Sequence, residues 1–214
     1  MDPFTLPPGE KWQQHELRAL GIRDFARARE DAPLNPFALA RFANLLVVDF
    51  NRIEGLSPQA REHLLGVASG EWSGGACSRE LPDGRKLIIL NPTHGRQRKH
   101  ATLMEEICHV FLGHTPNRLA IVTAGKGGRI VARDYEKTDE EAAYATGAAA
   151  LVPFSSLRRF LHQGKSASEI AKHFRVSREL VQYRLKVTRL WSLYKSAHPA
   201  ESVQLHRASG SRSR

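Results

Sequence analysis

The sequence predicts an α+β fold followed by a small module built only of helices. Over residues 10–153, apolar residues recur at helical spacing in some segments and form short β-prone runs in others, a mixture typical of α+β domains. Over residues 166–190 the spacing is that of a helix-turn-helix. The chain has 214 residues, of which 41% are hydrophobic and 25% are charged. It is therefore long enough to bury the core of one domain and of a small second one.

Charge is distributed unevenly along the chain. Residues 154–214 hold 13 of the 32 Lys and Arg side chains but only three of the 22 Asp and Glu side chains, so they carry the whole net charge of +10. A basic segment of this kind indicates a nucleic-acid partner. The alternative is a basic surface that keeps the protein soluble and has no partner.

Local signals predict the individual elements. Helical spacing of apolar residues predicts a helix over residues 10–29. Asn35-Pro36 and Ser57-Pro58 each predict the start of a helix, because Asn and Ser are good N-caps and Pro suits the first turn. The other expected elements are a strand at residues 47–50, a hairpin with an Asp-Gly turn at 76–91, a helix at 101–114, a hairpin at 119–132 and an Ala-rich helix from 139 to before Pro153.

The helix at residues 101–114 contains the pattern Glu-Glu-x-x-His, formed by Glu105, Glu106 and His109. Because an α-helix turns by about 100° per residue, Glu105 and His109 lie about 40° apart on one face, and Glu106 lies about 60° from His109. Zinc hydrolases use two ligands at this spacing, with a glutamate between them as general base. The alternative is a solvated pair of glutamates beside a structural histidine.

Three neighbouring features surround this pattern. His114 lies about 140° from His109 on an unbroken helix, so we expect it to follow a helix stop at Gly113 and to pack near the site. Cys108 has no evident base beside it and is expected to be a small buried apolar residue. A basic segment comes just before the helix, and its residues are Arg96, Arg98, Lys99 and His100.

The stretch LIILNPTHGRQRKHATLMEEICHVFLGH, residues 87–114, resembles the ImmA/IrrE family of zinc-dependent endopeptidases. In that family a strand ending in Asn leads through a basic loop into a helix that reads T-L-x-H-E-x-x-H-x-x-x-G-H. The matching residues are Asn91, Thr102, Leu103, Glu106, His109, Gly113 and His114. Residues 34–50 resemble the family's opening helix and strand, and residues 140–153 resemble its acidic, Ala-rich helix. With the helix-turn-helix, the resemblance covers residues 35–190.

This resemblance implies a zincin-like metallopeptidase domain with a small mixed sheet. It implies zinc held by Glu105, His109 and Glu141, with Glu140 as the alternative to Glu141, and Glu106 as the general base that takes a proton from a metal-activated water. It also implies a cytoplasmic regulatory endopeptidase that cleaves a partner protein, such as a transcriptional repressor.

One departure from the family pattern bears on activity, because Glu105 stands where the family has its first histidine ligand. A carboxylate binds zinc at nearly the same distance as an imidazole. Two carboxylates leave less positive charge on the metal, however, so the bound water becomes a poorer acid. Harder ligands also favour Mn²⁺ or Mg²⁺ over zinc. The alternative is therefore a catalytically inactive peptidase fold without metal, acting as a DNA- or protein-binding regulator.

Residues 166–190 predict the helix-turn-helix in detail. Ser168 or a neighbour caps the first helix and Ser177 caps the second. Arg175 stands where the turn usually has Gly, and a positive φ at a non-Gly residue costs about 1 kcal/mol. The residues expected to meet bases and phosphates are Arg178, Gln182, Tyr183, Lys186 and Arg189. The alternative roles of such a module are protein docking and a purely structural function.

These patterns together predict four segments: an N-terminal extension and helix at residues 1–34, the peptidase domain at 35–153, the helix-turn-helix module at 154–195 and a basic tail at 196–214. With only two cysteines, a disulfide framework is not expected, and a reducing, cytoplasmic location follows. No apolar run approaches the roughly 20 residues that span a bilayer, so we expect no membrane partner.

Overall fold

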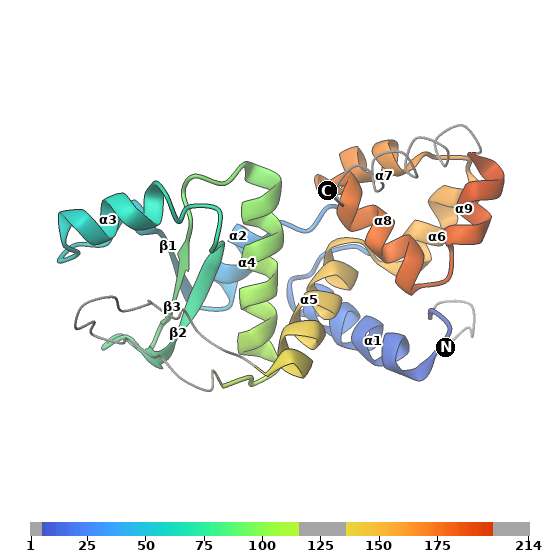
Figure 1. Cartoon of the computed structure of the whole chain (residues 1–214). Coiled ribbons are helices and arrows are strands. Elements are labelled where there is room, and N and C mark those ends of the chain that lie inside the picture. Colours follow the sequence, from blue (N-terminus) through green and yellow to red (C-terminus); the bar gives the residue numbers. More distant parts are fainter. Residues whose placement is uncertain (1–5, 116–135, 199–214) are drawn as a thin grey trace. The chain divides into compact units, whose positions relative to one another are not determined.

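The computed structural model describes residues 6–115 and 136–198, apart from the side chains of Ser78 and Arg79. Contacts divide the chain into two compact units, Leu34–Ala148 and Met1–Pro33 together with Ala149–Arg214. Figure 1 shows the helices and strands of each unit. The hairpin expected at residues 119–132 and most of the expected tail lie outside the described residues. Across the described ranges, no helix is both long enough and apolar enough to cross a membrane.

The unit Leu34–Ala148 contains a small mixed sheet, as predicted. Its strands are β1 (Leu45–Asp49), β2 (Gly74–Glu80) and β3 (Lys86–Leu90), in the order β1-β3-β2. β1 runs parallel to β3, and β2 runs antiparallel to β3. The predicted hairpin is thus confirmed, and Gly84 in its turn has a φ of 77°, a conformation that glycine adopts without strain.

The helices of this unit are α2 (Pro36–Phe42), α3 (Pro58–Leu65), α4 (Arg96–Phe111) and α5 (Lys137–Leu151), and a short 3₁₀ helix, η1 (Phe50–Arg52), follows β1. Of these helices, α2 and α3 begin where the cap residues predict, whereas α4 begins five residues before the expected start at 101 and α5 two residues before the expected start at 139. The Asn35 side chain accepts a hydrogen bond from the Phe37 N–H at 3.1 Å, and the Ser57 side chain accepts one from the Ala60 N–H at 3.1 Å. Both caps are therefore confirmed.

The core of this unit lies between α4 and the sheet. α4 packs against β2 and β3 (Figure 1), and Ile88 and Leu90 of β3 are fully buried. The side chains that α4 buries completely are Leu103, Met104, Ile107 and Cys108. Each large apolar side chain buried in this way contributes about 2 kcal/mol. This apolar face fixes the rotation of α4 and so the direction of Glu105, Glu106 and His109.

The second unit is all-helical. It contains α1 (Glu10–Phe25), α6 (Phe154–His162), α7 (Ala167–Phe174), α8 (Arg178–Val187) and α9 (Trp191–Ala197). α7 and α8 form the predicted helix-turn-helix, in which Ser166 caps α7 through a capping box with Glu169 and Ser177 caps α8. Arg175 has a φ of 58° between them, so the predicted left-handed turn without glycine is confirmed.

A buried polar network ties α1 to α8 in this unit. The Arg184 guanidinium of α8 forms an ion pair with the Glu16 carboxylate of α1, and both residues are 1% exposed. The Nε–H of Arg184 donates to the Val152 carbonyl at 3.0 Å, and the other oxygen of Glu16 accepts from the Phe154 N–H at 2.6 Å. The N-terminal helix thus belongs to the core beneath the helix-turn-helix.

Candidate functional site

The predicted site residues of α4 line one side of the helix at its C-terminal half. Glu106 is 9% exposed and His109 is 2% exposed, while Glu105 is half-buried. Cys108 is fully buried, and burial followed by the charge of Glu105 raises the pKa of its thiol far above the ordinary value. Cys108 is therefore a neutral core residue, as expected, and not a nucleophile.

Glu106 is held by the sheet. Its Oε2 accepts a hydrogen bond from the backbone N–H of Ala76 at 2.7 Å, and Ala76 belongs to the edge strand β2. A hydrogen bond from a backbone donor orients a carboxylate and stabilises its charged form. The residue predicted as general base is therefore an oriented carboxylate between α4 and β2.

His109 is engaged from two sides. Its Nδ1 lies 3.1 Å from the Nδ1 of His114, and the two rings meet edge to face with centroids 5.1 Å apart. His114 reaches this place because α4 ends at Phe111 and Gly113 turns the chain back with a φ of 70°. The expectation that His114 follows a glycine stop and packs near the site is thus confirmed.

Helix α5 brings carboxylates to the two histidines. Glu140 Oε2 lies 3.7 Å from His109 Nε2, and Asp139 Oδ1 lies 3.6 Å from His114 Nε2. Glu141, which the family resemblance indicates as a ligand, follows on the helix, and both glutamates are exposed. Of the two glutamates weighed from the sequence, the structure therefore brings Glu140 to His109. The pairing of Asp139 with His114 was not foreseen.

Gly147 of α5 lies against α4. A Cβ added at this position would be in ordinary van der Waals contact, 3.4 Å from Met104 Cγ and 3.5 Å from the backbone N of Glu105. Ala143 and Ala145 of the same helix are buried as well. Small residues let two helix backbones come close together, and so the acidic start of α5 lies near the end of α4.

Glu105 lies among like charges. Burial raises its pKa, and the negative charges of Glu140 and Glu106 raise it further, to about 7. A carboxyl group with this pKa is about half protonated at neutral pH. A bound cation would relieve the repulsion between these carboxylates. Without a cation, the repulsion disfavours having the carboxylates so close together.

The donor arrangement does not fit a metal ion as it stands. Over residues 6–115 and 136–198, no three His, Cys, Asp or Glu side chains are grouped so that they could hold one. Glu105 repels Glu140, while both ring nitrogens of His109 already face other side chains. A zinc site needs three protein ligands that converge on one point at about 2 Å. The side chains of Glu105, His109 and Glu140 would have to rearrange to meet this requirement.

The predicted nucleic-acid contacts lie in the other unit. Lys186 and Arg189 are exposed, and Arg178, Gln182 and Tyr183 are half-buried. Arg184, which falls in the same helix, points inward to Glu16 and has a structural role. One face of α8 is therefore buried and holds the helix in place, while its other side is basic and partly exposed.

A Mycobacterium tuberculosis transcriptional regulator resembles the chain with a TM-score of 0.48 and 16% identity, over 80% of this chain and 46% of that one. This chain thus spans less than half the length of that regulator. No curated protein matches the sequence.

A comparison with models of protein families shows to which family the chain belongs. The M78 peptidase family, described as the IrrE N-terminal-like domain, matches residues 68–186. Because this match covers more than half of the chain and includes α4, α5 and the helix-turn-helix, the protein belongs to the M78 peptidase family of IrrE N-terminal-like domains.

Proposed function

We propose that this protein is a regulator that keeps the peptidase fold but does not hydrolyse peptides, and that it binds DNA through α7 and α8. The observation that carries the first part is the surroundings of Glu105. This carboxyl group occupies the position of the first family ligand, and burial and two neighbouring carboxylates raise its pKa to about 7. Because Glu105, at the first ligand position, repels Glu140, at the third, the site is poorly suited to hold a metal ion. This supports a protein that has kept the peptidase fold without the hydrolytic activity.

The helix-turn-helix supports the second part of the proposal. Both helices are capped, and the second helix is anchored from below by Arg184. Lys186 stands exposed in its last turn, and Arg189 stands exposed just after its end. A helix fixed in orientation with exposed cations is suited to contact phosphates, and its half-buried Gln182 and Tyr183 can reach base edges.

We expect Lys186→Gln combined with Arg189→Gln to weaken binding to a random 20-base-pair duplex by roughly tenfold and to lower the slope of log affinity against log salt by about two, one for each lost phosphate contact. Fluorescence anisotropy at several salt concentrations measures both quantities. The matched control is Arg52→Gln combined with Lys137→Gln, which removes the same charge from exposed positions of the other unit. Equal weakening by the two double variants would contradict binding by α8.

One arrangement favours a second candidate function, a metal-dependent endopeptidase that acts in the cytoplasm on a partner protein such as a transcriptional repressor. Glu140 lies 3.7 Å from His109, and its charge acts on Glu105, so three possible ligands lie in one region of the molecule. Glu105, His109 and Glu140, or Glu141 in its place, would have to hold the ion. The family resemblance implies zinc, whereas Mn²⁺ is better suited to a site with two carboxylate ligands.

Metal binding discriminates between the two candidate functions. A regulator without peptidase activity requires no metal for folding or for DNA binding, whereas the endopeptidase requires one metal ion per chain. The zinc content of the parent, compared with that of variants of Glu105 and His109, therefore distinguishes them.

A further inference from the structure

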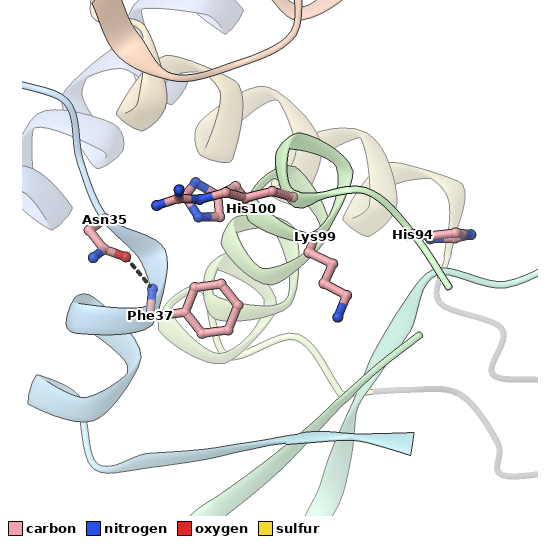
Figure 2. Close-up of a pocket in the computed structure, with 6 residues that line it drawn as sticks. Asn35, Phe37, His94, Lys99 and His100 are labelled. Atoms are coloured by element: carbon pink, nitrogen blue, oxygen red, sulfur yellow. Dashed lines mark hydrogen bonds between the residues drawn. The ribbon is translucent and has the colours of Figure 1, made fainter. Parts of the chain in front are cut away.

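A second site lies at the opposite end of α4 from the glutamates. Here a cavity of about 350 Å³ opens between the start of α2 and the first turns of α4. The residues that line it are Asn35, Phe37, His94, Arg96, Lys99 and His100. Figure 2 shows Phe37 on α2 and His100 and Lys99 on α4 around this space, with His94 farther along its edge. Its volume lies within the range of small-molecule sites.

The lining of the cavity is basic. Lys99 Nζ forms an ion pair with Asp49 Oδ1 at 3.1 Å. Arg96 is exposed and makes no ion pair with any residue that the structure describes. Burial lowers the pKa of His94, and the positive charges of Arg98 and Lys99 lower it further. The charges around the cavity therefore disfavour another cation there and favour an anion.

His94 also has a ring nitrogen that lacks a partner. Its Nε2 lies 3.2 Å from the Ser69 carbonyl oxygen, and its Nδ1 is buried without a hydrogen-bond partner among the described residues. A buried polar atom without a partner costs free energy of about 1–3 kcal/mol. A ligand that supplies a hydroxyl hydrogen, or an anion that stabilises the protonated ring, would remove this cost.

The start of α4 also favours an anion in the cavity. Its N-cap, Gly95, has no side chain to accept a hydrogen bond from the first turn, and that turn contains no acidic residue. Cations near a helix N-terminus are unfavourable by a few tenths of a kcal/mol to about 1 kcal/mol each. Arg96, which is exposed, and Lys99, which is half-buried, are placed here nevertheless, and both line the cavity.

The cavity also has an apolar wall. Phe37 is half-buried, and its ring meets the ring of His100 edge to face with centroids 5.6 Å apart. Asn35, whose Oδ1 accepts a hydrogen bond from the Phe37 N–H, also lines the cavity. Basic groups on one side and an aromatic ring on the other suit a small molecule that has both an anionic and an apolar part.

We propose that this cavity binds a small organic phosphate, with its phosphate at Arg96 and the start of α4 and its carbon part on Phe37. The site lies wholly within the unit Leu34–Ala148, and its ligand is distinct from the DNA assigned to α8. The volume of the cavity and its aromatic wall at Phe37 favour a small molecule over the backbone of a nucleic acid.

The test uses phenyl phosphate, inorganic phosphate and phenol as probes of the whole ¹⁵N-labelled chain, followed by NMR titration. We expect phenyl phosphate to bind with a dissociation constant below about 1 mM, several times more tightly than inorganic phosphate, whereas phenol gives no saturation. Arg96→Gln should weaken the binding of both phosphates by roughly tenfold, since a charge-assisted hydrogen bond is lost. Phe37→Leu should remove the preference for phenyl phosphate over inorganic phosphate.

Arg98→Gln is the matched control. Arg98 lies in the same turn, is exposed and donates to Ser73 Oγ at 3.0 Å outside the cavity lining. We expect this variant to keep phenyl phosphate affinity within about twofold. Equal weakening by Arg96→Gln and Arg98→Gln would overturn the proposal, as would the absence of saturation by phenyl phosphate. Displacement of phenyl phosphate by a short duplex whose own affinity falls with Arg96→Gln would assign the surface to nucleic acid and overturn it as well.

Discussion

Arg184→Met is expected to lower the free energy of unfolding by about 3–5 kcal/mol, because it leaves the Glu16 carboxylate charged and buried without its partner. Both side chains are 1% exposed, and Arg184 also donates to the Val152 carbonyl. Urea denaturation followed by circular dichroism measures the loss. The same variant should also lose DNA binding, since α8 is no longer anchored to α1.

A double variant separates the ion pair from the packing. Glu16→Met combined with Arg184→Met removes both buried charges, so part of the lost stability should return relative to Arg184→Met alone. The Val152 carbonyl and the Phe154 N–H then lack partners, which keeps the recovery incomplete. A loss below about 1 kcal/mol in Arg184→Met would show that this pair does not hold the helix-turn-helix in place.

Glu105→Gln is expected to stabilise the protein at pH 8 and to leave its stability unchanged at pH 4.5. The pKa of Glu105 is about 7 in the folded chain, against 4.5 ordinarily. The folded state therefore keeps a proton that the unfolded state has already released, and stability falls as the pH rises from about 4.5 to about 7. A shift of this size corresponds to about 3 kcal/mol as an upper bound. Because Glu105 is half-buried, we expect a gain of about 1–2 kcal/mol at pH 8 after screening by solvent.

Denaturant titrations of both proteins at pH 4.5 and pH 8, with a chelator present, test this expectation. Glu141→Gln is the matched control, because it removes the same charge from an exposed position of α5 and should change stability by less than about 0.5 kcal/mol. A parent that is more stable than Glu105→Gln at pH 8 would mean that the ionised carboxylate has a favourable partner in the folded state.

Much of the fold could be predicted from local signals. Asn35, Ser57 and Ser177 cap the helices that follow them, and the Asp-Gly turn joins β2 and β3. These features depend on a few neighbouring residues, and so a single sequence contains them. The packing of α1 on α8 could not be predicted in this way. Glu16 and Arg184, which pair across it, are 168 positions apart, and the residues next to them in the sequence do not indicate that either side chain is buried.

The site was predictable in part. Spacing on one helix brings Glu105, Glu106 and His109 together, and the glycine at 113 returns His114 to them. The choice between Glu140 and Glu141 depends on the rotation of α5, which the pattern of neighbouring residues does not determine. The basic cavity could not be predicted, because the sequence pattern places Arg96 and Lys99 before the helix, whereas α4 in fact begins at Arg96.

The zinc affinity of the parent, measured by competition with a chromogenic chelator beside elemental analysis of the untagged protein, tests the central claim most directly. We expect far less than one zinc per chain in the parent, and we expect Glu105→His to raise the affinity at least about tenfold, because it replaces a repelled carboxylate by a neutral imidazole. Near-stoichiometric zinc in the parent that is lost in both Glu105→Ala and His109→Ala would contradict the claim and establish a metal site of glutamates and histidine.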